Sequence, residues 1–187
     1  MSDNNGYQYL DNIGPEEQAR LDAVRRYYQL IDQPVEPYER VAAVAGALFD
    51  TPIATISMVE QDRVWIAACQ GLHGVRQVGK EPGLCASVIL RDGVYVVNNA
   101  AVDPRTRDHP LVRGDLALRF YAAAPIRTYD GYRLGTVNVI DSRPRETTQR
   151  QLDALEHLAA LVADELELRL MVVRSAAAEQ RMRETVG

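Results

Sequence analysis

The sequence contains few of the residues that build disulfide frameworks and metal centres. Its 187 residues include only two cysteines, Cys69 and Cys85, and three histidines. Two cysteines do not form a disulfide framework in a chain of this length, so we expect a reducing, cytoplasmic location. The histidines, His73, His109 and His157, show no ligand spacing to one another or to the cysteines. We therefore predict no metal site.

A basic surface and a long apolar run are also missing. The formal net charge is −5, which argues against a broad nucleic-acid footprint. No run approaches the roughly 18 apolar residues of a membrane span. The first twelve residues, MSDNNGYQYLDN, have neither the basic start nor the apolar core of a secretory signal. We therefore predict no nucleic-acid partner and no membrane partner.

The length suits one domain with appendages. We predict a flexible tail over residues 1–14, a domain with its own terminal helices over 15–173, and a helix end with a polar tail over 174–187. A first helix is expected from Pro15 until Pro34 and Pro37 break it, and a second over about 38–49. Their apolar faces are predicted to comprise Leu21, Val24, Tyr28 and Ile31, then Val41, Val44, Ala45 and Leu48.

The middle of the chain has the signals of an antiparallel sheet. Asp130-Gly131 separates two β-prone runs, which is a strong hairpin signal because glycine reaches positive φ without steric cost. Earlier strands are predicted at 53–59, 64–69 and 94–97. The glycine-rich segment 71–83 is expected to be a loop, followed by a short helix over 84–90. A further helical turn is expected at 111–114.

A long helix is predicted from about residue 147 to beyond 177, with Thr147 or Thr148 as its cap. It carries two apolar stripes: Leu152, Leu155, Ala159, Val162, Leu166, Leu170 and Val173, and beside them Leu158, Leu161, Leu168 and Val172. The helix could cover a broad sheet and end in a frayed, charged segment. We favour self-association, because large unpaired apolar patches are rare on soluble monomers.

Five segments, in this order along the chain, carry a family resemblance. They are GLCAS at 83–87, VVNNA with DPR at 96–105, HPLV at 109–112, RFYAAAPI at 119–126 and LGTVNVID at 134–141. Together they resemble the motifs of a GAF domain over about residues 36–170, in particular the bacterial sensory GAF domains found with cyclic-dinucleotide enzymes and histidine kinases. Ser87, Asn99 and Asn138 depart from that branch, where His, Asp and Cys are common.

The resemblance implies an α+β fold of the GAF/PAS-like kind. Its antiparallel sheet would have five or six strands, with helices on both faces and a pocket on one of them. It also implies frequent dimerisation through the first and last helices. It names neither a ligand nor a cofactor for this chain.

Four polar residues alternate along the two strands of the hairpin. Period two places Arg119 and Tyr121 on one face of the first strand, and Thr136 and Asn138 on one face of the second. If the two faces coincide, they form a polar patch in an otherwise apolar sheet. Such a patch could orient a ligand or could be a satisfied polar network in the core. An amide in so apolar a strand requires partners, which singles out Asn138.

Other residues are candidates through the family pattern. The resemblance places Trp65, Arg76 and Ser87 beside the pocket, although Trp65 also suits simple core packing. Asp103 and Arg105 belong to a charged loop with Asp108 and His109. That loop could close over a ligand, or its acidic residues could serve as helix caps and ion-pair partners.

Cys85 precedes the predicted short helix, where a thiol could be activated or could act as a small buried hydrophobe. A regulatory disulfide with Cys69 is a further possibility. GAF domains that reduce free methionine sulfoxide resemble this chain at Cys85 but need another cysteine in the later loop. No cysteine lies between Asp103 and Arg119, which argues against that reductase.

We therefore predict a non-catalytic sensory GAF domain that binds a small molecule and signals through dimerisation helices. Its partners would be an unknown small molecule, a second copy of the chain and a separate signalling protein. Two alternatives stay open: a thiol-based redox sensor or reductase that uses Cys85, and a ligand-free interaction scaffold.

Overall fold

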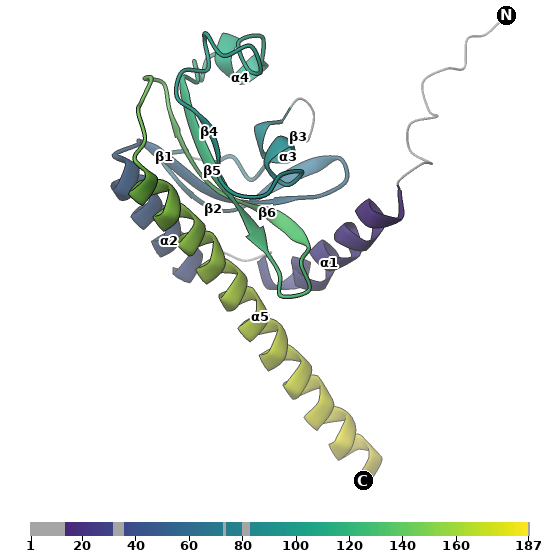
Figure 1. The fold of residues 1–187 in the computed structure, drawn as a ribbon. Helices are drawn as coiled ribbons and strands as arrows, with labels where there is room; N and C mark the ends of the chain where they lie inside the picture. The colour runs from purple at the N-terminus through teal and green to yellow at the C-terminus, as the bar shows by residue number, and fades with distance from the viewer. Residues whose placement is uncertain (1–13, 32–35, 73, 80–82, 187) are drawn as a thin grey trace, which may run out of the picture.

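The computed structural model describes residues 14–31, 36–72, 74–79 and 83–186. A six-stranded, fully antiparallel sheet forms its centre, in the order β3-β2-β1-β6-β5-β4 (Figure 1). The strands are β1 (Ile53–Val59), β2 (Arg63–Gln70), β3 (Gln77–Gly79), β4 (Tyr95–Val97), β5 (Phe120–Arg127) and β6 (Arg133–Asp141). The predicted α+β class, antiparallel sheet and hairpin are confirmed.

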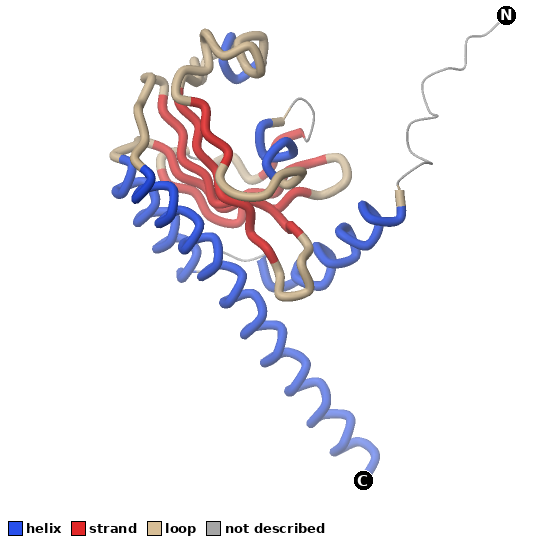
Figure 2. Tube along the Cα trace, in the orientation of Figure 1, coloured by secondary structure: helices blue, strands red, loops and turns tan. Residues whose placement is uncertain are grey.

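Helices lie on both sides of the sheet (Figures 1 and 2). One side is covered by α1 (Pro15–Ile31), α2 (Glu36–Phe49) and the first half of α5 (Gln149–Val186). The other side carries two short helices, α3 (Leu84–Val88) and α4 (Pro110–Arg113). The sheet therefore separates the large apolar cluster under the long helices from two smaller clusters on the side of the short helices.

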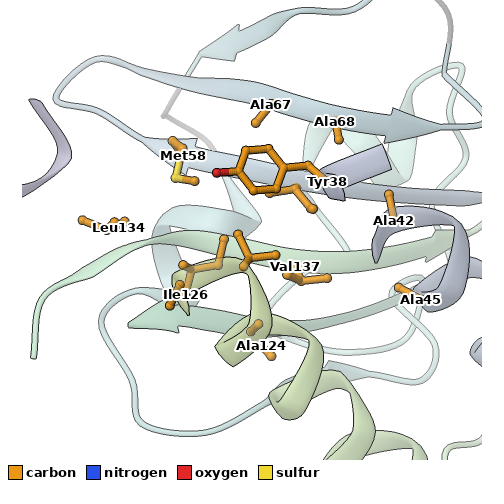
Figure 3. Close-up of a cluster of buried hydrophobic side chains, with 14 of the residues drawn as sticks. Tyr38, Ala42, Ala45, Met58, Ala67, Ala68, Ala124, Ile126, Leu134 and Val137 are labelled. Carbon is orange, nitrogen blue, oxygen red and sulfur yellow. The ribbon is translucent and has the colours of Figure 1, made fainter. Parts of the chain in front are cut away.

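The larger cluster packs the long helices onto the sheet. Figure 3 shows Tyr38 of α2 among strand residues that include Met58 and Val137. Small side chains such as Ala42 and Ala124 let the helices approach the strands closely. Tyr38 is almost fully buried, and this burial raises the pKa of its hydroxyl. This layer is a filled core, which leaves the opposite face of the sheet for a binding site.

The structure corrects several boundary predictions. Pro37 does not break a helix but lies in the first turn of α2, where a missing N–H has no intrahelical partner to lose. Val44 is 53% exposed because the buried face of α2 is formed by other residues, including Tyr38, Ala42 and Phe49. The predicted loop 71–83 contains strand β3, which pairs with β2.

The structure describes only part of the apolar face that was predicted for α1. Leu21 and Val24 are buried as expected, and Tyr27 is buried with them. The side chains of Tyr28 and Ile31 lie outside the described residues, as do residues 1–13 of the predicted flexible tail. The domain boundaries 1–14, 15–173 and 174–187 therefore stay predictions, although the last segment is helical as far as Val186.

Helix α5 begins at a reciprocal cap. The Thr148 hydroxyl accepts from the Gln151 N–H at 3.3 Å, and the Gln151 side chain accepts from the Thr148 N–H at 3.0 Å. Its sheet-facing residues are buried as far as Leu170. The described side chains from Met171 onward are exposed, so Val173 does not continue the buried stripe. With 38 residues the helix is about 57 Å long and extends well past the sheet (Figure 1).

Candidate functional site: a cavity beneath the short helices

Strand register brings polar side chains from three strands onto one face of the sheet. Directly paired residues of antiparallel strands point to the same side. Asn138 of β6 pairs with Thr55 of β1 and with Ala123 of β5, two residues from Tyr121. Ser57 pairs with Thr136 in the same way. The two faces predicted from the hairpin therefore coincide, on the side that carries α3.

These side chains form a hydrogen-bonded floor around Asn138. The Thr55 hydroxyl donates to Asn138 Oδ1 at 2.9 Å. Asn138 Nδ2 donates to Ser57 Oγ and to Thr136 Oγ1, both at 3.0 Å. All four side chains are buried, so the floor supplies the partners that a buried amide requires. Their hydrogen bonds connect β1 and β6 through one side-chain network.

A cavity of about 290 Å³ lies above this floor. Its walls come from the sheet, from β3, from α3 and from the segment around α4, and they are mostly aliphatic. The lining comprises Thr55, Ser57, Val64, Ile66, Leu72, Val75, Val78, Gly79, Gly83, Leu84, Cys85, His109, Pro110, Leu111, Leu116, Leu118, Tyr121, Asn138 and Ile140. A mainly apolar hollow with a few convergent polar groups is the usual form of a small-molecule site.

Cys85 joins the floor to α3. Its Sγ lies 3.4 Å from the Tyr121 hydroxyl and 3.8 Å from Ser57 Oγ. Burial, followed by the neighbouring Cys85, raises the pKa of the Tyr121 hydroxyl well above its ordinary value. Tyr121 therefore stays uncharged at neutral pH, and it adds a neutral group to the cavity.

Four of the ten predicted site residues meet here. Cys85, Tyr121 and Asn138 line the cavity, and Thr136 is bonded to the floor beneath it. Three others lie outside the lining: Trp65 packs toward the large helix-side core, Arg76 has an exposed side chain, and Ser87 is half-buried on α3.

The remaining three predicted residues fix the segments around α4. Asp103 pairs with Arg105, which lowers the pKa of the Asp103 carboxyl. The Arg105 guanidinium lies 5.0 Å from the centre of the Tyr95 ring. Arg119 donates to the carbonyls of Val112 and Leu118 at 3.1 and 3.0 Å. These three residues therefore stabilise the segments around α4, which cover the cavity, and do not line it themselves.

In the charged loop the predicted ion pairs are confirmed, but neither Asp103 nor Asp108 caps a helix. Asp103 accepts a hydrogen bond from the Arg105 N–H at 2.9 Å within a turn that no described helix follows directly. Asp108 pairs with Arg113. The cap of α4 is His109, whose Nδ1 accepts from the Leu111 N–H at 3.0 Å.

The predicted site residues did not include Thr55 and Ser57, and His109 was predicted only as a member of the charged loop. Thr55 and Ser57 alternate along β1 among apolar residues, and this pattern was a usable signal. The small side chains of Ala86, Ala122, Ala123 and Ala124 predict open space near the pocket. Ala122 and Ala124 face the long helices instead, and the cavity lining includes none of the four.

Both thiols are free. Burial raises the pKa of Cys69, which favours its neutral form. Within the described residues, no group of His, Cys, Asp and Glu side chains is arranged to hold a metal ion. None of the described helices is long and apolar enough to cross a membrane.

A second hollow, of about 560 Å³, lies between α2 and the end of β6. Within it, Arg145 contacts Asp141 at 2.6 Å and Asp50 at 3.5 Å. Because three of the four charged residues that line this hollow pair with one another, we place the candidate site in the cavity under the short helices.

Comparison with known proteins agrees with this architecture. The model of the GAF domain family matches residues 34–166, and the chain belongs to this family. Its fold is a sensory, ligand-binding one. Over 128 residues the chain is 44% identical to the cyclic di-GMP phosphodiesterase PA2567 of Pseudomonas aeruginosa. The match covers 68% of this chain but only 22% of that relative.

Solved structures show the same fold at low sequence identity. The blue-light absorbing form of the Thermosynechococcus elongatus PixJ GAF domain has a TM-score of 0.63 at 14% identity, and the match covers 91% of this chain and 98% of that one. The GAF domain of the Acinetobacter phosphoenolpyruvate-protein phosphotransferase has a TM-score of 0.60 at 18% identity, with 83% and 98% covered.

Proposed function

We propose that this GAF domain is a non-catalytic sensor that binds a small molecule in the cavity and passes its occupancy to a dimer of terminal helices. One observation carries the proposal: a hollow of about 290 Å³ with a hydrogen-bonded polar floor lies on one face of the sheet, while the long helices pack on the other. The proposed ligand site and the helices that would carry the signal therefore pack on opposite faces of the same sheet.

The mechanism is a population shift. The cavity is closed by α3 and by the segment around α4, which are short elements joined by loops. A ligand that prefers one arrangement of these segments stabilises that arrangement by its difference in affinity. The floor residues Thr55 and Asn138 lie on β1 and β6, whose reverse faces pack against the long helices. Movement of the floor would therefore reach α2 and α5.

The proposed dimer surface is an outer stripe on α5. The outer stripe consists of Leu161, Leu168, Met171, Val172 and Met182, each more than half exposed. At 3.6 residues per turn, it lies on the side of α5 opposite the residues that pack on the sheet, such as Leu155 and Leu166. Leu161, Leu168 and Met182 fall on a seven-residue repeat, which suits a helix that pairs with its copy.

We expect Leu168→Glu to weaken the dimer at least about tenfold, because it would place an unpaired carboxylate in the contact. The matched control is Ala177→Glu, which adds the same charge on the opposite side of α5, beyond the sheet. Sedimentation equilibrium of wild type and both variants measures the effect. A monomeric wild type, or equal weakening by both variants, would contradict dimerisation through this stripe.

A catalytic role for Cys85 has less support. Within the described residues its thiol contacts hydroxyl and amide groups, those of Ser57, Tyr121 and Asn138, which do not act as bases at neutral pH. The reductase-type loop between Asp103 and Arg119 supplies no second thiol. A ligand-free scaffold would need a filled pocket, and the hollow argues against it. We propose a cytoplasmic setting and a separate signalling protein as recipient of the output.

A further inference from the structure

We infer that the cavity takes up an extended aliphatic chain, with one end of the chain above the floor and the rest leaving through a rim of exposed aliphatic side chains. The inference rests on the proposed sensory function and narrows the ligand to a free, medium-chain amphiphile. Three features carry it: a floor whose polar groups bond to one another, aliphatic walls, and the aliphatic rim.

The floor presents little free polarity to the cavity. Four of its side chains are at most 4% exposed: Thr55, Ser57, Tyr121 and Asn138. Both polar atoms of the Asn138 amide are engaged, by Thr55 on one side and by Ser57 and Thr136 on the other. A polar ligand group that competed for these partners would have to break hydrogen bonds already made within the protein. We therefore expect an apolar end of the ligand to rest on the floor.

The walls above the floor are aliphatic and buried. Five of the lining side chains are at most 8% exposed: Val64, Ile66, Leu84, Leu118 and Ile140. Apolar surface placed against such walls is removed from water, and this removal drives binding. An apolar cavity of about 150 Å³ holds one benzene, so a cavity of about 290 Å³ has room for about ten carbon atoms.

Exposed aliphatic side chains continue this lining to the surface. Val75, Val78 and Leu111 line the cavity, yet they are 37%, 45% and 38% exposed. Val78 of β3 pairs with Val64 of β2, so both side chains point to the cavity side of the sheet. A compact ligand held among the buried walls would leave this rim in water, whereas a chain that passes over it would cover it. The rim therefore favours an extended ligand.

Straight-chain alcohols from 1-butanol to 1-decanol measure the contribution of the chain. Titrations followed by the ¹³C-methyl resonances of labelled Val and Leu give their dissociation constants. We expect saturable binding that tightens about three- to fourfold for each added methylene, as for methylenes removed from water. Alkanoates from hexanoate to decanoate should show the same gain per methylene, because the head group lies outside the buried walls.

The same spectra locate the chain. 1-Decanol should shift methyl resonances of the buried wall, at Val64 and Leu118, and also of the rim, at Val78 and Leu111. 1-Butanol is too short to span both sets and should shift the buried set more strongly. Shifts by 1-decanol that are confined to one set would contradict an extended chain.

The variant Val78→Thr tests the rim with little change of shape. Threonine keeps the β-branched form that suits a strand but places a hydroxyl where the chain would pass. The affinity for 1-decanol should fall at least about threefold, because the chain would cover that hydroxyl, while the affinity for 1-butanol stays within about twofold. Val102→Thr is the matched control, since Val102 is 70% exposed and lies outside the cavity lining. It should change neither affinity.

Phosphatidylcholine vesicles distinguish a free amphiphile from a lipid held in a bilayer. A cavity with room for about ten carbon atoms is too small for a whole lipid, so the protein should stay in the supernatant when the vesicles are sedimented. Co-sedimentation with the vesicles would overturn the free source of the chain.

Affinity that does not rise with chain length would overturn the chain class. So would binding of 1-decanol that Val78→Thr leaves unaltered or weakens no more than Val102→Thr does. If no alcohol or alkanoate binds but the purified protein retains a molecule of another class, the chain class is wrong and the sensory function stands. If none binds and no molecule is retained, both fail.

Discussion

Gly135→Ala is expected to unfold the domain. Gly135 lies within β6 opposite Met58 of β1, and a Cβ built there would sit 1.8 Å from the Ser57 carbonyl oxygen and 2.8 Å from Met58 Cα. These obstacles are backbone atoms of the central strands, so no side-chain rotation can relieve the clash. We expect the free energy of unfolding to fall by more than about 4 kcal/mol, with loss of soluble protein as the practical outcome.

The matched control is Gly14→Ala, where no atom lies within 4 Å of the added Cβ. Urea titration followed by far-ultraviolet circular dichroism measures both variants. Gly14→Ala should lower the midpoint only slightly, by the roughly 1 kcal/mol that a poorer N-cap of α1 costs. A Gly135→Ala protein with a wild-type midpoint would mean that β1 and β6 are further apart than described here, and the register beneath the cavity floor would be wrong.

Asn138→Leu should cost about 3 kcal/mol of unfolding free energy. The leucine side chain has nearly the same size but removes three hydrogen bonds, so the buried hydroxyls of Thr55, Ser57 and Thr136 lose partners. These hydroxyls can still contact one another, since Ser57 Oγ and Thr136 Oγ1 lie 3.3 Å apart, and this limits the loss.

Asn98→Leu is the control for this change, because Asn98 is half-buried and donates to an exposed partner, Glu146. Asn98→Leu should lower the free energy of unfolding by less than about 1 kcal/mol. Chemical denaturation of both proteins gives the comparison. If the two variants proved equally stable, Asn138 would not organise the floor, and the sheet face would tolerate an apolar surface there.

Local patterns were enough to predict most of the sheet. The β-branched run of β6 and the Asp130-Gly131 turn specify a hairpin without help from the rest of the chain, and Gly131 has the expected positive φ of 91°. Strand β3 was missed because its three residues are exposed and owe their conformation to pairing with β2. Short edge strands of this kind carry no periodic apolar signal.

The site residues could be predicted only in part, because contacts between segments far apart in sequence bring several of them together. Period two predicted which residues share a face within each strand of the hairpin, and the register between β5 and β6 brings the faces of Tyr121 and Asn138 together. Thr55 and Ser57 join them through the register between β1 and β6, which depends on contacts between segments far apart in sequence. His109 reaches the cavity because α4 folds back over the sheet. Tertiary placement of this kind also explains why Trp65, Arg76 and Ser87 lie outside the lining.

Native mass spectrometry of freshly purified protein measures ligand occupancy and dimerisation together. We expect a two-chain species that carries extra mass of small-molecule size, which is released under denaturing conditions. Ile66→Phe, which enlarges a wall residue, should lose the extra mass, whereas Val44→Phe on the exposed side of α2 should keep it. A bare single-chain mass for the wild-type protein, unaltered by Ile66→Phe, would contradict a ligand-binding dimeric sensor.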